Sequence, residues 1–263
     1  MDLGIRGRAA LVFGGSKGLG RGCADALAAE GVDVALVARG REALERAAAE
    51  IAARHGVAAH AFAADLADHD AVLRAVGQAE RALGGRVDVL VNNSGGPPPS
   101  GAAGVDPAVW AAQFQAMVLG VIRATDRVLP GMRARRWGRV LTIASVTVVE
   151  PIPTLGISNT LRAALAGWSK TLATEVAREG VTVNMILPGR ISTDRTAFLD
   201  GAAAERAGRS AAAVQAERAA EIPAGRYGTP EEFGAVAAFL ASERAAFVTG
   251  SMVRVDGGAT RAV

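Results

Sequence analysis

The chain has 263 residues, of which 50% are hydrophobic, 21% charged and 4% aromatic, and its formal net charge is +3. Such a composition excludes general disorder and supplies a buried core, while scattered basic residues and few aromatic side chains argue against nucleic-acid binding. The single cysteine, Cys23, excludes an internal disulfide, so we expect a cytoplasmic protein with this thiol in its core.

Short apolar runs alternate along the chain with longer segments of helical period, a pattern typical of βα units in a parallel sheet. The predicted strands span residues 9–13, 32–37, 57–62, 87–91, 140–143, 181–187 and 251–255. Stretches between them, such as 41–54 and 71–82, repeat apolar residues every three or four positions and are predicted crossover helices. The sequence therefore predicts an α/β fold, a Rossmann-like doubly wound sheet of seven parallel strands with helices on both faces, in three layers.

No linker divides the chain, so residues 1–263 are expected to form one domain. The proline-rich segment 96–101 follows the fourth predicted strand and is interpreted as a loop beside a ligand. Residues 195–221 form a polar helical insertion, which we interpret as a substrate lid. The sequence contains neither a membrane-length apolar run nor a signal-peptide pattern nor zinc-site spacing, so no membrane, secretion or metal site is expected.

A glycine-rich segment, residues 14–20, connects the first predicted strand to the first helix. Glycine permits the tight turn and the close backbone approach that place a pyrophosphate at the positive end of a helix. The position inside a βαβ unit is the context that this motif requires. We expect a dinucleotide site to which this segment contributes Gly14, Ser16, Lys17, Gly18, Leu19 and Gly20.

The end of the second predicted strand indicates which dinucleotide binds. An NAD-selective site carries a carboxylate there for the ribose 2′-hydroxyl, whereas this chain has Ala38 followed by Arg39. Arg39, with Ser16 and Lys17, offers donors to a 2′-phosphate, and the guanidinium fork matches that group. The sequence therefore predicts NADP(H); the alternative is that Arg39 is a solvated loop residue.

Further landmarks follow the later strands and carry a family resemblance. They are Ala64-Asp65-Leu66, Asn92-Asn93-Ser94-Gly95, Ser145, Pro188-Gly189 and Asp256-Gly257-Gly258. In this order, and together with the glycine-rich segment, they make the chain resemble a short-chain dehydrogenase/reductase over nearly its whole length. The resemblance implies a nicotinamide-dependent oxidoreductase.

The resemblance also implies roles for residues outside the glycine-rich segment. Asp65 would bind the adenine, Asn92 would support the adenosine-side ribose and the central sheet, and Ile191 with Thr193 would hold the nicotinamide carboxamide. Taken alone, Asp65 is alternatively a helix N-cap. The remaining expected cofactor residues are Leu66, Ser94, Gly95, Arg162, Pro188 and Gly189.

The catalytic residues depart from the family pattern of Asn, Ser, Tyr and Lys, of which only Ser145 is retained. The tyrosine position, thirteen residues after Ser145, holds Ser158; the lysine position holds Arg162, and the asparagine position Met117. The single tyrosine, Tyr227, lies in a later turn and is expected to be structural. Lys170 lies further along the helix and is expected on its surface.

A serine hydroxyl is a much weaker acid than a phenol, and an arginine keeps its proton at accessible pH. Proton delivery to a simple alkoxide should therefore be poor. Ser158 and Arg162 are four residues apart on one helix face, so both can point into the nicotinamide pocket. We expect Arg162 to bridge ribose hydroxyls, while Ser145, Ser158 and Asn159 donate hydrogen bonds to a substrate oxygen.

Such a site suits hydride addition to a C=C bond conjugated to a carbonyl, because protonation can come later from water. The Ser-Asn-x-x-Arg pattern resembles a divergent 3-oxoacyl-carrier-protein reductase-like subgroup and is similar to an ene-reductase of the bacilysin pathway. A ketoreductase with a water relay held by Ser145 and Ser158 is the rival. The other alternative is an NADP(H)-binding sensor or partner subunit with little or no turnover.

The substrate is expected to be a small, apolar molecule. The resemblance implies a homo-oligomer, a tetramer or a dimer, assembled through the helix that carries Ser158.

Overall fold

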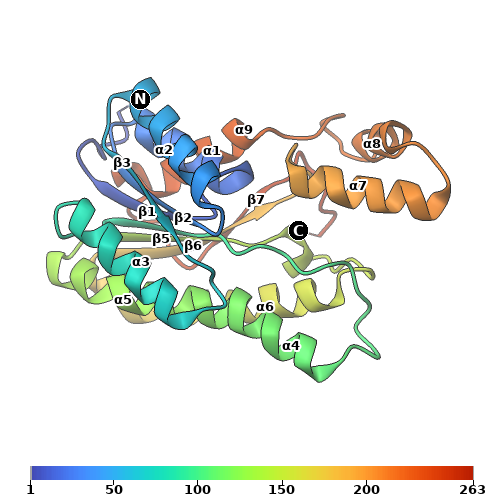
Figure 1. Ribbon diagram of the computed structural model, residues 1–263, viewed down its shortest axis with the longest axis horizontal. Coiled ribbons are helices and arrows are strands. Elements are labelled where there is room, and N and C mark those ends of the chain that lie inside the picture. Colours follow the sequence, from blue (N-terminus) through green and yellow to red (C-terminus); the bar gives the residue numbers. More distant parts are fainter. Residues whose placement is uncertain (1, 263) are drawn as a thin grey trace.

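The computed structural model describes residues 2–262, so residues 1 and 263, the ends of the expected domain, lie outside the described residues (Figure 1). Within that range the sheet has seven parallel strands in the order β3-β2-β1-β4-β5-β6-β7. The strands are β1 (Ala9–Phe13), β2 (Asp33–Ala38), β3 (Ala59–Ala63), β4 (Val89–Asn92), β5 (Gly138–Ile143), β6 (Val181–Pro188) and β7 (Met252–Val255). The order reverses between β1 and β4, the switch point where doubly wound sheets bind ligands.

Helices cover both faces of the sheet, which confirms the predicted three-layer α/β fold. On the upper face in Figure 1 lie α1 (Gly18–Ala29), α2 (Arg41–His55) and α9 (Pro230–Leu240). On the lower face lie α3 (His69–Ala82), α5 (Gly120–Arg135) and α6 (Gly156–Val176), with α4 (Pro107–Phe114) extending from that layer. Short 3₁₀ turns are η2 (Val146–Val148), η3 (Ala177–Glu179) and η4 (Glu243–Ala245).

Burial within the sheet follows strand position. Every residue of β1, β4, β5 and β6 is buried, because helices cover both faces of these central strands. The edge strands β3 and β7 are only partly buried. Cys23, on the buried face of α1, lies in the core, as predicted, and burial raises the pKa of its thiol to about 12. This thiol is therefore un-ionised at neutral pH.

The predicted helical insertion forms two helices, α7 (Asp194–Ala207) and α8 (Ala211–Ala220). They project beyond the sheet at the right of Figure 1. Gly208, at φ +62°, ends α7, and the Ser210 hydroxyl caps α8 by accepting from the Ala213 N–H at 3.2 Å. The first two residues of α7 contact the loops after β1 and β4, so the insertion lies at the end of the molecule where the loops that follow the strands lie.

Between residues 2 and 262, no helix combines the length and the apolar character needed to cross a membrane. His, Cys, Asp and Glu side chains of the same residues form no group that could hold a metal ion.

Candidate cofactor and active site

The corner between β1 and α1 depends on glycine. Gly14 at φ +64° and Gly18 at φ +59° adopt the left-handed conformation that side chains disfavour. A Cβ added to Gly20 would lie 2.4 Å from the carbonyl oxygen of Gly14, so α1 can pack against the corner only because residue 20 has no side chain. The predicted tight turn is therefore present at the amino end of α1.

The amino end of α1 fits an anionic group. Its N-cap residue, Lys17, makes no side-chain hydrogen bond to the helix, whereas Asp68 caps α3 and Thr193 caps α7. The N–H groups of the first turn, which includes Leu19 and Gly20, therefore have no side-chain acceptor, and the helix dipole adds positive potential. A pyrophosphate is the group that this combination of turn and uncapped helix accommodates.

Arg39 and Lys17 are the two cations predicted to bind the 2′-phosphate. Arg39, directly after β2, is exposed and forms no ion pair with any other described residue. Lys17 instead pairs with Asp194, the first residue of α7, with 2.7 Å between Nζ and Oδ2. Both side chains of that pair are largely exposed, so it contributes less than about 1 kcal/mol and leaves Lys17 available to a stronger anion.

The predicted cofactor roles of Asn92, at the end of β4, and of Asp65, after β3, stay predictions, but the structure excludes one alternative for Asp65. Asn92 is buried and its Nδ2 donates to Thr125 Oγ1 of α5 at 3.0 Å, which links the central sheet to that helix. The alternative role of Asp65 as an N-cap is wrong: α3 begins at His69 and its N-cap is Asp68, whose carboxylate accepts from Ala71 N at 2.9 Å. Asp65 is exposed; its Oδ1 accepts from Ala67 N at 3.0 Å, and its Oδ2 is available to a ligand.

The residues near the ends of β3 and β4 include an unpartnered hydroxyl group and a glycine with open space beside it. Ser94 Oγ is buried and has no hydrogen-bond partner among the described residues, and a Cβ on Gly95 would meet nothing within 4 Å. The backbone of Leu66 packs against Gly120, where an added Cβ would lie 2.6 Å from the Leu66 carbonyl oxygen. A bound molecule at this edge would supply the partner that Ser94 lacks.

The loop after β6 comes close to the glycine corner. The Gly189 N–H donates to the Val255 carbonyl at 2.9 Å, directly after Pro188 ends β6, and Ile191 is buried. Thr193 methyl carbon Cγ2 lies 3.6 Å from the position of a Cβ built on Gly18. The structure thus brings the first and sixth strand ends together, as a dinucleotide site requires.

Ser158 and Arg162 form a buried pair one turn apart on α6. Arg162 Nε donates to Ser158 Oγ at 3.2 Å, and its Nη1 donates to the Ile143 carbonyl at the end of β5, also at 3.2 Å. Ser145, two residues beyond β5, accepts from Thr147 N at 3.2 Å as the cap of η2. The two α6 residues therefore point toward the strand end that Ser145 follows, which agrees with the shared face expected from their spacing.

Burial, and secondarily the charge of Arg195, lower the pKa of Arg162 to about 10. Arg162 is therefore still protonated at neutral pH. In the described part of the chain no carboxylate lies within 4.0 Å of it, so its positive charge has no counter-ion. Because Ser158 Oγ accepts from Arg162, the Ser158 O–H proton is free to be donated elsewhere.

Comparisons with known proteins identify the family. A family model described as "Enoyl-(Acyl carrier protein) reductase" matches residues 14–260. The 3-oxoacyl-[acyl-carrier-protein] reductase FabG of Aquifex aeolicus is 33% identical over 260 residues, which cover 98% of this chain and 99% of that protein. The chain belongs to the short-chain dehydrogenase/reductase family.

Two solved structures of reductases share the fold. The L-sorbose reductase of Gluconobacter frateurii, complexed with NADPH and L-sorbose, has a TM-score of 0.94 and 34% identity, with 100% of both chains covered. YwfH, an NADPH-dependent reductase involved in bacilysin biosynthesis, has a TM-score of 0.92 and 29% identity, and covers 97% of this chain and 99% of its own. The similarity to a reductase of the bacilysin pathway is therefore confirmed for fold and sequence.

The amide of Asn159, a predicted donor to the substrate oxygen, has one backbone acceptor in the structure. Its Nδ2 donates to the Ile152 carbonyl at 2.8 Å, so the amide holds the segment before α6 in place. Its Oδ1 is buried and has no partner among residues 2–262. The second N–H of Nδ2 has no acceptor among the described residues, so the donation from Asn159 to a substrate oxygen stays a prediction.

Met117 occupies a feature that sequence reasoning missed. It lies buried in a π-helical segment, η1 (Gln115–Leu119), inserted between α4 and α5. Single π-helical turns occur frequently at functional sites because they turn one side chain out of helical register. Nothing in the local sequence signals this insertion, since residues 107–119 contain no proline beyond the first position and no glycine.

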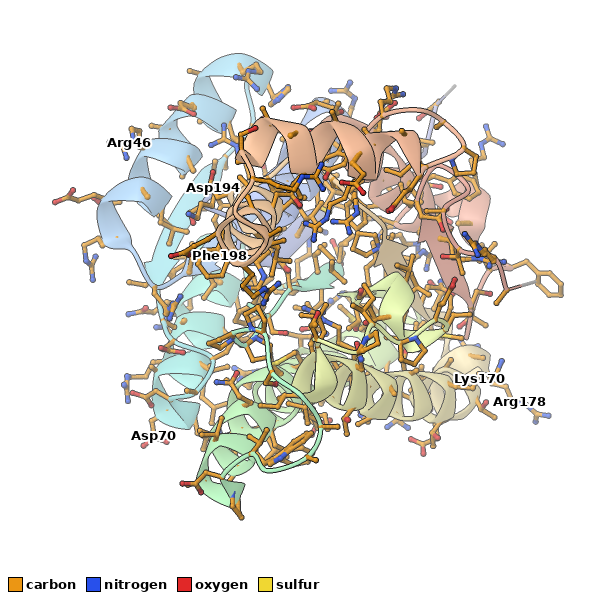
Figure 2. All side chains as sticks on the ribbon, turned by 90° about the vertical axis from the view of Figure 1, so that its right-hand side faces the viewer. Arg46, Asp70, Lys170, Arg178, Asp194 and Phe198 are labelled. Atoms are coloured by element: carbon orange, nitrogen blue, oxygen red, sulfur yellow. The ribbon has the colours of Figure 1, made fainter. Side chains whose placement is uncertain are left out.

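Lys170 and Tyr227 do not replace the missing side chains. Lys170 is exposed, as predicted, and Figure 2 shows it well away from Asp194 and Phe198 of α7. Tyr227 is buried, and its hydroxyl donates to Asp200 Oδ2 at 2.9 Å. Burial and the Asp200 carboxylate raise the pKa of Tyr227 to about 12, which makes it a poor proton donor.

Asp200 connects the two helices of the insertion to the body of the protein. This buried carboxylate binds Arg218 of α8 and lies 3.5 Å from Nη1 of Arg190 in the loop after β6. Tyr227 completes the cluster from the loop before α9. A cavity of about 260 Å³ lies beside it, lined by Ser192, Thr193, Thr196, Ala197, Asp200, Ala211, Ala212, Gln215 and Tyr227.

Replacing Tyr227 with phenylalanine tests its structural role. We expect the free energy of unfolding at neutral pH to fall by about 1–2 kcal/mol, because one buried hydrogen bond to a carboxylate is lost. The raised pKa means that the contribution of the phenol is complete below pH 10 and is lost as the pH rises toward 12. Denaturant unfolding measures the loss; a reductase activity that disappears in the folded variant would instead make Tyr227 catalytic.

Proposed function

We propose that this protein reduces a small conjugated enone or carbonyl compound at a site built from Ser145, Ser158 and Arg162. It is a reductase of the short-chain dehydrogenase/reductase family, and its cofactor is NADP(H). Bound NADPH supplies the hydride. The observation that carries the proposal is the buried Arg162–Ser158 pair, hydrogen-bonded at 3.2 Å and directed at the end of β5.

The adenosine half of the cofactor binds at the carboxyl ends of β1, β2, β3 and β4. The glycine corner, with Gly14, Gly18, Leu19 and Gly20, holds the pyrophosphate. Arg39 holds the 2′-phosphate together with Ser16 and Lys17, whose ion pair with Asp194 is weak enough to exchange. Asp65 and Leu66 bind the adenine, and Asn92 supports the adjacent ribose. Ser94 and Gly95 line the centre of the site.

The nicotinamide half is assigned to the β5 and β6 side. Pro188, Gly189, Ile191 and Thr193 hold the carboxamide, and Arg162 donates to the ribose hydroxyls with the N–H groups that Ser158 and Ile143 leave free. We propose that residues 1–263 form one domain in which α7 and α8 cover this half as a lid.

The acidities of the site favour an enone over a simple ketone. Ser145 and Ser158 donate hydrogen bonds to the substrate oxygen, and the charge of Arg162 stabilises the negative charge that develops on it. Neither hydroxyl releases a proton easily, and the folded-state pKa of Arg162, about 10, keeps this group protonated at neutral pH. A stabilised enolate can take its proton later from water, whereas a simple alkoxide needs an acid at once.

The proposed homo-oligomer assembles through α6. On this helix Ala163, Ala164 and Gly167 are exposed, and a Cβ on Gly167 would meet nothing within 4 Å. Small side chains on an exposed helix face allow a second copy to approach closely.

The deciding experiment is oxidation of NADPH with neutral substrates of three classes: cyclohexenone, ethyl acetoacetate and menadione. We expect turnover of the enone. Its rate should be constant from roughly pH 6 to 9, because neither serine nor Arg162 titrates there, and should fall as the pH rises through about 10, where Arg162 loses its proton.

The other outcomes identify the alternatives. Turnover of ethyl acetoacetate alone would favour a ketoreductase with a water relay on Ser145 and Ser158, in line with the relatives named as 3-oxoacyl and L-sorbose reductases. Saturable NADPH binding without turnover of any compound would leave a sensor or partner subunit. Failure to bind NADPH would reject all three.

A further inference from the structure

Arg195 is a cation at the substrate side of the site with no assigned role. It is the second residue of α7, and its Nη2 donates to the Pro97 carbonyl at 2.7 Å, which connects the insertion to the loop after β4. A Cβ on Gly96 would lie 3.1 Å from the same nitrogen. The guanidinium therefore connects α7, which follows β6, to the loop after β4, and β5 lies between these two strands in the sheet. Figure 2 faces the end of the molecule where α7 lies.

The positive charge of Arg195 has no counter-ion within residues 2–262, where no carboxylate approaches it within 4.0 Å. The carboxylate next to it in sequence, Asp194, pairs with Lys17. One neutral carbonyl is its only hydrogen-bond acceptor among the described residues, although a guanidinium has five N–H donors. Buried charges are ordinarily paired, and the half-buried Arg195 guanidinium therefore has N–H donors available for an anion.

Arg162 is a second positive charge without a counter-ion in the same region. Burial lowers the pKa of Arg195, and the charge of Arg195 in turn lowers the pKa of Arg162, so the two guanidinium groups share one region of the site. Neither has a carboxylate partner among the described residues. Two cations without a counter-ion create a positive potential that attracts an anion to this region of the site.

Phe198 provides an apolar surface beside this charge. It lies three residues after Arg195 on α7, is 56% exposed, and its ring centre is 5.8 Å from the Arg195 guanidinium carbon. An exposed phenylalanine next to an unpaired guanidinium fits a molecule with an apolar body and one anionic end. This modifies the purely apolar substrate expected from the sequence.

We infer that the substrate carries a carboxylate and that Arg195 binds it through its free N–H donors. The inference rests on the proposed function, since it assigns the substrate class of the same site. Arg195 is then a specificity residue that selects the acid over its neutral ester. It leaves NADPH binding unchanged, because its hydrogen bond goes to the loop after β4 and not to the glycine corner that holds the pyrophosphate.

The test compares two acids with their methyl esters, benzoylacrylate for enone reduction and benzoylformate for ketone reduction. Binding to the NADP⁺-loaded protein is measured by calorimetry and turnover by NADPH oxidation. We expect the acid of at least one pair to bind about 10- to 100-fold more tightly than its ester, the gain typical of charge-assisted hydrogen bonds. Arg195→Gln should remove this difference by weakening the acid alone.

Control variants separate specificity from folding. Arg206→Gln removes the same charge from an exposed position on the same helix and should change the affinity for neither the acid nor the ester. Arg195→Lys keeps the charge without the fork and should retain part of the preference for the acid. Thermal melting and the dissociation constant for NADPH, unchanged in Arg195→Gln, show that the site is otherwise intact.

Acids that bind no better than esters, or do not bind, would overturn the inference. So would a loss of NADPH affinity in Arg195→Gln, because Arg195 would then serve the cofactor. The proposed function fails separately: a protein that binds the acid through Arg195 but turns over neither pair keeps the inferred anion site and loses the reductase assignment.

Discussion

Replacing Gly20 with alanine is expected to lower the affinity for NADPH by about 100-fold or more. The added Cβ would lie 2.4 Å from the carbonyl oxygen of Gly14 and 2.8 Å from Nδ2 of Asn93, so the start of α1 must move away from the corner. Its N–H groups then no longer converge on one anion. Each hydrogen bond to a charged group is worth about 1.5–3 kcal/mol, and losing one or two of them gives this factor.

The measurement is calorimetric titration with NADPH, accompanied by denaturant unfolding. Overpacking of this kind costs about 1–3 kcal/mol of stability, so the variant should still be folded at room temperature. The matched control is Gly40→Ala, which precedes α2: its Cβ would meet nothing within 4 Å and its φ of −85° suits any residue. A Gly20→Ala protein that binds NADPH within roughly threefold of the native chain would remove the glycine corner from the proposed site.

The sequence predicts the sheet well because each strand is a self-contained apolar run. Every predicted strand overlaps an observed one, and β1 has the same bounds, since Gly14 ends the run sharply. The boundaries shift where the signal is weaker: the third strand begins at Ala59 instead of residue 57. Gly56 marks the end of α2, but neither Val57 nor Ala58 is a glycine or proline that would mark where the strand begins.

The candidate site can be predicted only partly from the sequence, because its contacts join residues that are far apart along the chain. Spacing alone places Ser158 beside Arg162, since residues four apart share a helix face. It gives no sign that Arg162 donates to the Ile143 carbonyl, nineteen residues away, or that Arg195 reaches Pro97. These bonds depend on how α6 and α7 pack against the strand ends, and that packing is a tertiary property.

The cap of α3 shows a local signal that was available but ambiguous. Both Asp65 and Asp68 precede the apolar period of this helix, and both are favoured N-cap residues. The structure selects Asp68 because its carboxylate reaches the N–H three residues later, while Asp65 accepts from Ala67 in a turn of its own. Asp68 therefore caps α3 while Asp65 stabilises the preceding turn, and one carboxylate oxygen of Asp65 is available to a ligand.

Replacing Arg162 with methionine is expected to make the protein more stable and at the same time to weaken its binding of NADPH. The folded-state pKa of Arg162, about 10, means that folding disfavours the charged form by about 3 kcal/mol at all pH values below 10. Methionine fills a similar volume without a charge. It gives up the hydrogen bonds to Ser158 and Ile143, worth about 1 kcal/mol each, so the net gain in stability is about 1 kcal/mol.

The loss in affinity follows from the proposed contact with the nicotinamide ribose. Without the guanidinium, the dissociation constant for NADPH should rise about 10- to 100-fold, as expected for hydrogen bonds from a charged donor worth roughly 1.5–3 kcal/mol. A residue that lowers stability yet is required for the ligand is the usual signature of a functional site, because a buried unpaired charge has no structural benefit.

Unfolding by denaturant and calorimetry with NADPH measure the two effects on the same protein. Lys170→Met is the matched control, because it removes a cation from the exposed side of the same helix and should alter neither quantity beyond about 0.5 kcal/mol. If Arg162→Met unfolds more easily and still binds NADPH normally, the guanidinium is a structural tie between α6 and β5 instead. Higher stability together with weaker NADPH binding would show that the charge of Arg162 serves cofactor binding.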